Sequence, residues 1–325
     1  MRPVAVDLRK ALLMLTHAVL VACGTAALLA GTARGGEPAC EPDVWVVSTR
    51  CLGGTCCIPD EPRFGVERLG PGHCGRRTWQ QATLAELVDD PSQPLAIFIH
   101  GNRYDPASAK QQGLAIAHRL ARFSPTGVPA RTVVFSWPSE KQGLLLTDGR
   151  TKYQRCYSDA HYLAALLTRI DPNQPVAIVG YSFGGLIVME ALDNLCDTTS
   201  DQLPCGAGSL LCRPGPLHLV LVAPAVRCDA FAPRGPYHEA LACIDRLTLV
   251  INTRDDALRF FHLLDKRLDV PALGQVGMPS RWAAGETAFR MTDAASIIGR
   301  RHSLLKYLDS ATLSAVIATG AVAGL

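Results

Sequence analysis

The chain has little excess charge and few aromatic residues. Its formal net charge is +3 over 325 residues, and aromatic side chains make up 6% of the sequence. Nucleic-acid binding relies on a strong basic patch for the phosphates and on aromatic side chains that stack on bases. Because no basic run stands out, we expect no nucleic-acid partner. A hydrophobic share of 48% predicts an ordinary folded protein.

The sequence also lacks the cysteine spacing of a zinc site. It has 12 cysteines but no Cys-x-x-Cys pair, and His73 is the only histidine next to a cysteine. We therefore expect no metal, and disulfides of an oxidising compartment instead. Ten of the cysteines form two clusters, at 40–74 and 196–243, with Cys156 between them, and we expect pairing mostly within each cluster. Eleven cysteines follow Cys23, so one thiol should be left over.

Charge is absent from residues 11–33, directly after a basic head. This pattern is typical of an export signal. Residues 1–36 are thus predicted to be an export signal or an N-terminal membrane or lipid anchor, and the protein to be periplasmic, in the cell envelope, or secreted. Three outcomes stay open: cleavage after the small residues at 31–33, lipidation of Cys23 in a lipobox-like stretch at 20–23, or retention as an anchor.

Short apolar runs alternate with helical patterns through the rest of the chain. Runs typical of strands buried on both faces lie at 95–99, 131–136, 176–179, 217–222 and 247–251. Helical patterns lie at 106–123, 158–170 and 186–195. This alternation predicts an α/β fold with a doubly wound, mostly parallel sheet and helices on both faces.

Composition divides the part that follows residue 36. Residues 37–90 are cysteine-rich and form an N-terminal part of the domain, and residues 91–325 form its core. Residues 196–216 are rich in Cys, Gly and Pro. They are predicted to be a disulfide-pinned excursion at the mouth of the site, or else a surface loop without a role.

Ser182 lies at the centre of a glycine-flanked turn. Gly180 and Gly184 stand two residues before and after it, with an apolar strand ahead and an apolar helix behind. This is the context of a nucleophile elbow, whose tight turn leaves no room for a Cβ at either glycine. The turn lifts the serine hydroxyl and aims the next backbone N–H, that of Phe183, at the reacting centre. We predict that Ser182 is a nucleophile.

A serine nucleophile needs a base, and the base needs an acid that orients it. In this topology the acid and then the histidine follow the serine along the chain. His302 precedes the last helical segments and is the predicted base. Asp255 is the preferred acid because it comes first after the strand at 247–251, and Asp256 is the alternative. Asp229 is a more remote candidate.

An oxyanion hole requires two N–H donors. Phe183 supplies one, and the loop that follows the strand at 95–99 should supply the other. Gly101 in that loop permits close approach of the backbone, which makes Asn102 the predicted donor. His100 is interpreted as a packing and hydrogen-bonding residue and not as a base. No metal or organic cofactor is implied.

These residues resemble the α/β-hydrolase superfamily and, more narrowly, the bacterial esterase/lipase-like α/β-hydrolases of unknown function. The likeness rests on Phe-Ile-His-Gly-Asn at 98–102, Phe-Ser-Trp-Pro-Ser at 135–139, Tyr153 with Asp159, Gly-Tyr-Ser-Phe-Gly at 180–184, Leu-Val-Ala-Pro at 221–224, Asp-Asp-Ala-Leu at 255–258, and His302. In that family the acid stands two residues before Ala-Leu, which here is Asp255. Relatives often have His-Ser-Met-Gly where this chain has Tyr-Ser-Phe-Gly, and the cysteine clusters are not a general family feature.

The sequence therefore predicts an exported serine hydrolase that cleaves carboxylic ester or thioester bonds through an acyl-enzyme. Its expected partner is a small-molecule or lipid-like ester, with membrane association through the N-terminus as an option. The alternative is a non-catalytic α/β-hydrolase-like binding or envelope scaffold protein, because a fold by itself does not fix a function.

Overall fold

A computed structural model describes residues 41–72, 76–124, 129–196, 213–264, 270–283 and 287–325. The predicted leader at 1–36, Cys23, and residues 197–212 of the predicted excursion lie outside the described residues. The described helices include none that is both long and apolar enough to cross a membrane.

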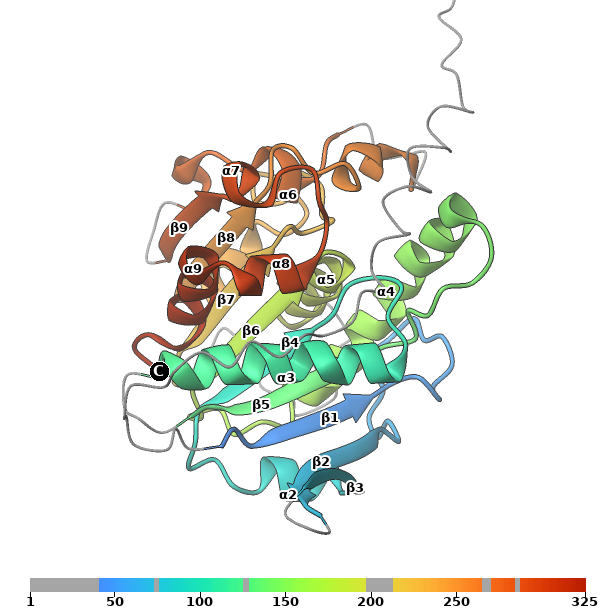
Figure 1. Cartoon of the computed structure of the whole chain (residues 1–325), viewed down its shortest axis with the longest axis vertical. Coiled ribbons are helices and arrows are strands. Elements are labelled where there is room, and N and C mark those ends of the chain that lie inside the picture. Colours follow the sequence, from blue (N-terminus) through green and yellow to red (C-terminus); the bar gives the residue numbers. More distant parts are fainter. Residues whose placement is uncertain (1–40, 73–75, 125–128, 197–212, 265–269, 284–286) are drawn as a thin grey trace, which may run out of the picture. The chain divides into compact units, whose positions relative to one another are not determined.

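A nine-stranded sheet organises the described part of the chain (Figure 1). The strands are β1 Val44–Ser48, β2 Gly65–Pro71, β3 Arg77–Gln81, β4 Leu95–Ile99, β5 Arg131–Ser136, β6 Val176–Tyr181, β7 Leu217–Val222, β8 Arg246–Ile251 and β9 Ala288–Asp293. Their order across the sheet is β3-β2-β1-β5-β4-β6-β7-β8-β9. Pairing is antiparallel from β1 to β3 and parallel elsewhere. The predicted mostly parallel, doubly wound sheet is confirmed.

Helices cover both faces of this sheet. The α-helices are α2 Leu84–Val88, α3 Pro106–Arg122, α4 Leu145–Leu167, α5 Phe183–Cys196, α6 Leu273–Val276, α7 Ala295–Ile298, α8 Leu304–Asp309 and α9 Ala311–Val322. Short 3-10 helices are η3 Glu239–Cys243, η4 Leu258–Leu263 and η5 Ser280–Ala283. In Figure 1, α3, α8 and α9 lie on the near face, and α4 packs with α5 on the other.

The central strands form because their side chains are apolar on both faces. Every residue of β4, β5, β6 and β7 is buried. This burial removes apolar surface from water at roughly 25 cal/mol per Å² and drives the strands together. Strand β6 lies between β4 and β7, with Gly180 beside Ile99 and Tyr181 beside Val222. The carboxyl ends of these neighbours therefore meet at one edge, where ligands bind in open α/β sheets.

The sequence patterns missed some elements. The edge strands β3 and β9 were not predicted, because their sequences, Arg-Thr-Trp-Gln-Gln and Ala-Phe-Arg-Met-Thr-Asp, are polar and largely exposed. Helix α4 begins at Leu145 and not near 158. Its first turns mix Asp, Gly, Arg and Lys, which hides the helical period. Packing against α5 stabilises α4 as a whole, and in its first turns Arg150 Nε donates to Leu263 O at 3.0 Å.

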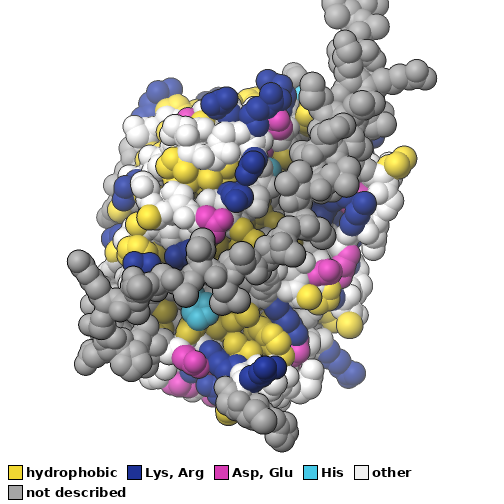
Figure 2. All heavy atoms as spheres, in the orientation of Figure 1, with side chains coloured by type: hydrophobic (Ala, Val, Ile, Leu, Met, Phe, Trp, Pro, Cys, Tyr) yellow, Lys and Arg dark blue, Asp and Glu magenta, His cyan; other side chains and the backbone are white. Residues whose placement is uncertain are grey.

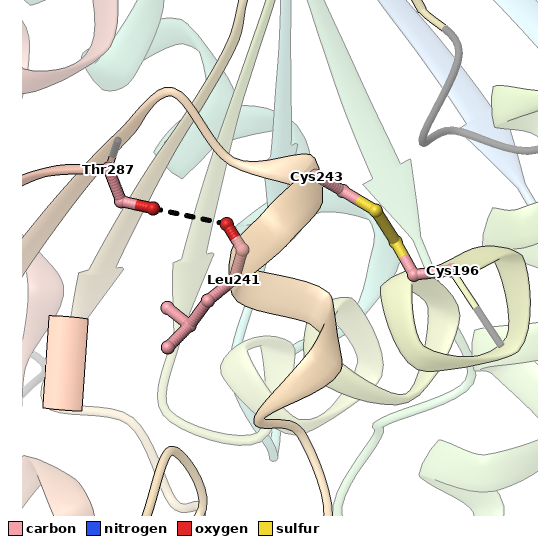
Figure 3. The surroundings of a disulfide bond; sticks show 4 residues. All are labelled: Cys196, Leu241, Cys243 and Thr287. Atoms are coloured by element: carbon pink, nitrogen blue, oxygen red, sulfur yellow. Dashed lines mark hydrogen bonds between the residues drawn. A yellow bond between two sulfur atoms is a disulfide. The ribbon is translucent and has the colours of Figure 1, made fainter. Parts of the chain in front are cut away.

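One disulfide links the end of α5 to η3 (Figure 3). Cys196 and Cys243 are separated by 47 residues, and both belong to the predicted second cluster. Among the described residues, the thiols of Cys51, Cys56, Cys57, Cys156 and Cys228 are free. The bond ties the end of α5, the helix that follows Ser182, to the segment between β7 and β8. Because it closes a long loop, it also restricts the unfolded chain and so favours the folded state.

Candidate active site

Ser182 lies in the turn between β6 and α5, in a backbone conformation that is unusual for serine. Its φ is +54°, in the left-handed region that costs a residue with a Cβ about 1–2 kcal/mol. Hydrogen bonds hold it there. Its N–H donates to Val222 O at 3.1 Å, and its carbonyl accepts the N–H groups of Gly185 and Ala225, each at 3.0 Å. The surrounding strands thus maintain the strain, as at many functional sites.

The flanking glycines are required, although for different reasons. A Cβ on Gly180 would lie 2.9 Å from the Cα of Gly185, within the elbow itself. A Cβ on Gly184 would lie 2.2 Å from the carbonyl oxygen of Ile99, at the end of β4. The expectation that both glycines serve the turn is therefore incomplete. Gly184 also lets α5 begin directly against the neighbouring strand.

Ser182 is hydrogen-bonded to a histidine that is hydrogen-bonded to an aspartate. The Nε2 of His302 lies 2.8 Å from Ser182 Oγ, and its Nδ1 lies 2.7 Å from Asp255 Oδ2. Because a carboxylate only accepts, Nδ1 carries the proton and donates to Asp255, which leaves Nε2 to accept from the serine hydroxyl. The structure brings these three predicted residues together over sequence separations of 47 and 120 residues.

Asp255 is well suited to hold the imidazole. Its side chain is fully buried, and its second oxygen accepts the N–H groups of Ala257 and Leu258 at 2.9 and 3.1 Å. The alternative acid, Asp256, does not reach His302. Its carboxylate is 39% exposed and pairs with Arg300 at 2.8 Å. Asp229 pairs with Arg227, which lowers the pKa of this carboxyl.

The two predicted oxyanion donors belong to segments that adjoin the serine. Phe183 is the first residue of α5, so its N–H has no acceptor within the helix. Asn102 follows Gly101 in the loop after β4. A Cβ on Gly101 would lie 3.1 Å from Ser182 Cβ, so this loop packs directly against the serine. Arg103, at φ +69°, ends the turn and donates its N–H to Ser139 O at 2.7 Å.

The comparisons with known proteins identify the family of the chain. The family model described as an alpha/beta hydrolase of unknown function (DUF900) matches residues 76–314, which is most of the chain. The chain belongs to this α/β-hydrolase family. No curated protein matches this chain.

Solved structures with the same fold are distant in sequence. An esterase/lipase from an uncultured bacterium is 12% identical, with a TM-score of 0.39, and the match covers 90% of this chain and 92% of that one. Esterase B from Lactobacillus rhamnosis is 13% identical, with a TM-score of 0.35 and coverage of 86% and 84%.

His100 holds the oxyanion-side loop of the α/β-hydrolase in place. Its Nδ1 donates to Gly101 O at 2.9 Å, and its Nε2 accepts the backbone N–H of Trp137 at 3.3 Å. The guanidinium of Arg50 lies 3.3 Å from the same Nε2. Burial lowers the pKa of His100 to about 3, so the ring is neutral. As interpreted from the sequence, His100 packs and hydrogen-bonds.

Sequence reasoning missed Asn252, which joins the acid loop to the base loop. This fully buried side chain donates from Nδ2 to the carbonyls of Gly299 and Arg301, at 2.9 and 3.3 Å. Its Oδ1 accepts the N–H of Arg254 at 3.1 Å. The residue before His302 is thereby fixed to the residues before Asp255. An asparagine directly after a buried strand is a signal that could have identified it.

Tyr181 packs against the imidazole of His302. Its ring stacks on His302, with centroids 5.2 Å apart and an interplanar angle of 26°. Tyr181 is buried, and desolvation raises the pKa of its phenol well above the usual value, so the ring remains neutral. The tyrosine next to the nucleophile is thus a platform that limits how far the imidazole can tilt.

Aromatic side chains cluster around Phe183, the first residue of α5. The ring of Tyr153 packs edge-on against Phe183 and Phe261, at centroid distances of 6.2 Å in both cases, and against Tyr157 at 5.9 Å. Tyr153 comes from α4, and Phe261 comes from η4, just beyond the acid loop. Tyr153, Phe183 and Phe261 are buried, so their rings form a packed apolar cluster next to the residue that follows the serine.

Cys156 is buried close to the residue that follows the serine, with its Sγ 3.9 Å from Phe183 O. Burial raises the pKa of the Cys156 thiol well above its usual range, which keeps it from acting as a nucleophilic thiolate. Among the described residues, no group of three or more His, Cys, Asp or Glu side chains is arranged to hold a metal ion.

Proposed function

We propose that this α/β-hydrolase is a serine hydrolase that cleaves carboxylic esters or thioesters through an acyl-enzyme. The observation that carries the proposal is the continuous hydrogen-bonded chain from Ser182 through His302 to Asp255, on a serine held at positive φ. Hydroxyl, imidazole and carboxylate in this order are the parts that activate a serine.

The reaction follows from these contacts. Ser182 Oγ attacks the carbonyl carbon while its proton moves to His302 Nε2. Asp255 stays ionised and stabilises the imidazolium through Nδ1. The N–H groups of Phe183 and Asn102 hold the oxyanion. When the tetrahedral intermediate collapses, the imidazolium gives its proton to the leaving alcohol or thiol. Water, deprotonated by His302, then attacks the acyl-enzyme, releases the carboxylic acid and restores the serine.

The apolar cluster of Tyr153, Phe183 and Phe261 makes the surroundings of the serine apolar, which supports an uncharged acyl or alkyl group as the part of the substrate next to it. Esters and thioesters have better leaving groups than amides, and no further acid group is needed beyond His302. We therefore place esters and thioesters ahead of amide hydrolysis and acyl transfer.

Covalent labelling tests the nucleophile directly. The full chain is treated with a fluorophosphonate and analysed by mass spectrometry, alongside Ser182→Ala. A single adduct on the wild type that maps to Ser182 and is absent from the variant supports the proposal. A folded wild type without an adduct would refute it and favour a binding or envelope scaffold protein. A panel of matched esters, thioesters and amides then separates the chemistries.

We also propose that the protein is exported. The basic head and uncharged run at 1–33 support this, and so does the disulfide between Cys196 and Cys243, a bond typical of oxidising compartments. The mass of the mature N-terminus distinguishes cleavage near residue 33, lipidation of Cys23, and retention of the whole segment. Recovery of an uncleaved chain from the cytosol would contradict export.

A further inference from the structure

A hollow adjoins the loops that carry Asp255 and His302. Its volume is about 640 Å³, and it is lined by residues 295–301 together with Arg254, Lys306, Asp309 and Ser310. These residues come from the loop after β8, from α7, from the loop between α7 and α8, and from α8 and the residue that follows it. We call this feature the basic groove. It belongs to no step of the proposed reaction.

The lining of the basic groove is strongly cationic. Arg254, Arg300, Arg301 and Lys306 contribute four positive groups against the single carboxylate of Asp309, in a chain whose net charge is only +3. Figure 2 shows Lys and Arg side chains over the region where Figure 1 places α7 and α8. A cluster of like charges raises the local potential and attracts anions.

Two of these four cations have ion-pair partners among the described residues, and two do not. Arg300 pairs with Asp256, and Lys306 lies 3.8 Å from Asp309. Neither Arg254 nor Arg301 forms an ion pair with any residue that the structure describes. Two guanidinium groups are therefore available for an external anion, and their planar forks match the oxygens of a phosphate.

An exposed apolar side chain stands beside these cations. Ile297 is 49% exposed, and it lines the basic groove next to the arginines. Cations alongside an exposed aliphatic group suit the surface of an anionic bilayer, where phosphates meet the arginines and the apolar group enters the acyl boundary. A soluble phosphate would leave Ile297 without a role.

We propose that the basic groove binds the phosphate headgroup of an anionic phospholipid and docks this face of the protein on a membrane surface. Arg254 directly precedes Asp255, and Arg301 directly precedes His302, so docking would bring a lipid-like ester close to the serine. That last step rests on the proposed function, whereas headgroup binding does not.

Vesicle binding tests the proposal independently of catalysis. All proteins carry Ser182→Ala, so no lipid is hydrolysed, and all keep the full N-terminus. Binding to vesicles of phosphatidylglycerol and phosphatidylcholine is compared with binding to phosphatidylcholine alone. The ratio of the two affinities isolates the anionic contribution, because the apolar N-terminal run contributes to both.

Removing each arginine should lower this ratio about fivefold, and Arg254→Ala with Arg301→Ala together about 25-fold. The matched control is Arg63→Ala with Arg122→Ala, which removes the same charge from exposed arginines outside the groove and should leave the ratio near the parent value. Ile297→Val, which removes one methylene, should weaken binding to the anionic vesicles about fourfold. Raising the salt concentration should weaken binding of the parent.

Equal ratios for the parent and the double arginine variant would overturn the proposal. So would an equal loss in the Arg63 and Arg122 control, which would show that only net charge matters. Binding of glycerol phosphate by calorimetry without any preference for anionic vesicles would also overturn it, and would point to a soluble phosphate ligand. If the fluorophosphonate does not label the wild type but the Ser182→Ala protein still prefers anionic vesicles, the proposed function is refuted and headgroup binding is not.

Discussion

The loop after β4 and the loop before α8 both carry a histidine toward the carboxyl edge of the sheet, and the two imidazoles have opposite surroundings. Both nitrogens of His100 are engaged by Gly101, Trp137 and Arg50. Those of His302 face Asp255 and Ser182. The residue type is the same, so the surroundings determine which imidazole can move a proton.

Burial separates the two rings further. His100 is fully buried next to the guanidinium of Arg50. Desolvation lowers the pKa of its imidazole to about 3, so the ring is neutral at pH 7. The side chain of His302 is 19% exposed, and it pairs with the buried carboxylate of Asp255. A structural histidine thus has its nitrogens satisfied within the protein, whereas a base retains one nitrogen for the reacting group.

The largest effect should come from the His302 side of this comparison. His302→Ala and Asp255→Asn should each lower kcat/KM for an activated ester by about 10⁴-fold, because the serine loses its base or the base loses its correct tautomer. Initial rates with a p-nitrophenyl ester measure this. Retained thermal unfolding temperatures serve as the control, and a loss below tenfold would remove His302 from the proposed mechanism.

The next effect should come from the His100 side, in stability. His100→Leu removes the acceptor for Trp137 N–H and the donor for Gly101 O. It should lower the free energy of unfolding by about 3 kcal/mol, because buried polar groups are left unsatisfied. Urea unfolding at pH 7 measures the change. An unchanged midpoint would show that the network around His100 contributes nothing.

The pH dependence sharpens that result. The pKa of His100 in the folded protein is about 3, below the ordinary value of 6.5, so its contribution is fully present above 6.5 and is lost as the pH falls toward 3. The loss amounts to roughly 1.4 kcal/mol per pH unit in that window. The difference in stability between wild type and His100→Leu should therefore narrow from pH 7 to pH 4. A constant difference would contradict a neutral His100.

Asn252 tests whether the His302 loop needs to be held. Asn252→Asp keeps the shape but replaces the Nδ2 donor with an acceptor that faces the carbonyls of Gly299 and Arg301. We expect kcat to fall about 30-fold with KM nearly unchanged, because His302 is displaced while the apolar cluster next to the serine stays intact. Thr253→Ala, in the same loop but bonded to Asp293, is the matched control and should keep kcat. Equal losses in both variants would show that the loop is merely destabilised.

The smallest effect should come from the second aspartate. Asp256→Asn removes an exposed ion pair with Arg300, which contributes roughly 0–1 kcal/mol. Ester hydrolysis should change less than threefold. A loss comparable to that of Asp255→Asn would mean that Asp256 is the acid and that the loop rearranges when substrate binds.

Much of the fold and the site was predictable. The unbroken apolar runs identified the buried central strands, because strands covered on both faces have no polar side. The glycine-serine-glycine turn identified the elbow, because its sterics are local. Polar edge strands such as β3, and the first turns of α4, escaped prediction because neighbouring elements, and not their own patterns, hold them in place.

The sequence by itself determined the order of strands and helices along the chain, the position of the strained serine, and the small set of aspartates and histidines that could serve it. Only the tertiary structure decided among them. It turned Asp255 toward His302 and left Asp256 to Arg300, and it placed Ile99 where a side chain on Gly184 would collide. It also set Asn252 between two loops. The physical reason is distance along the chain: these contacts join segments about 50 to 120 residues apart, and no local pattern encodes which of them will meet.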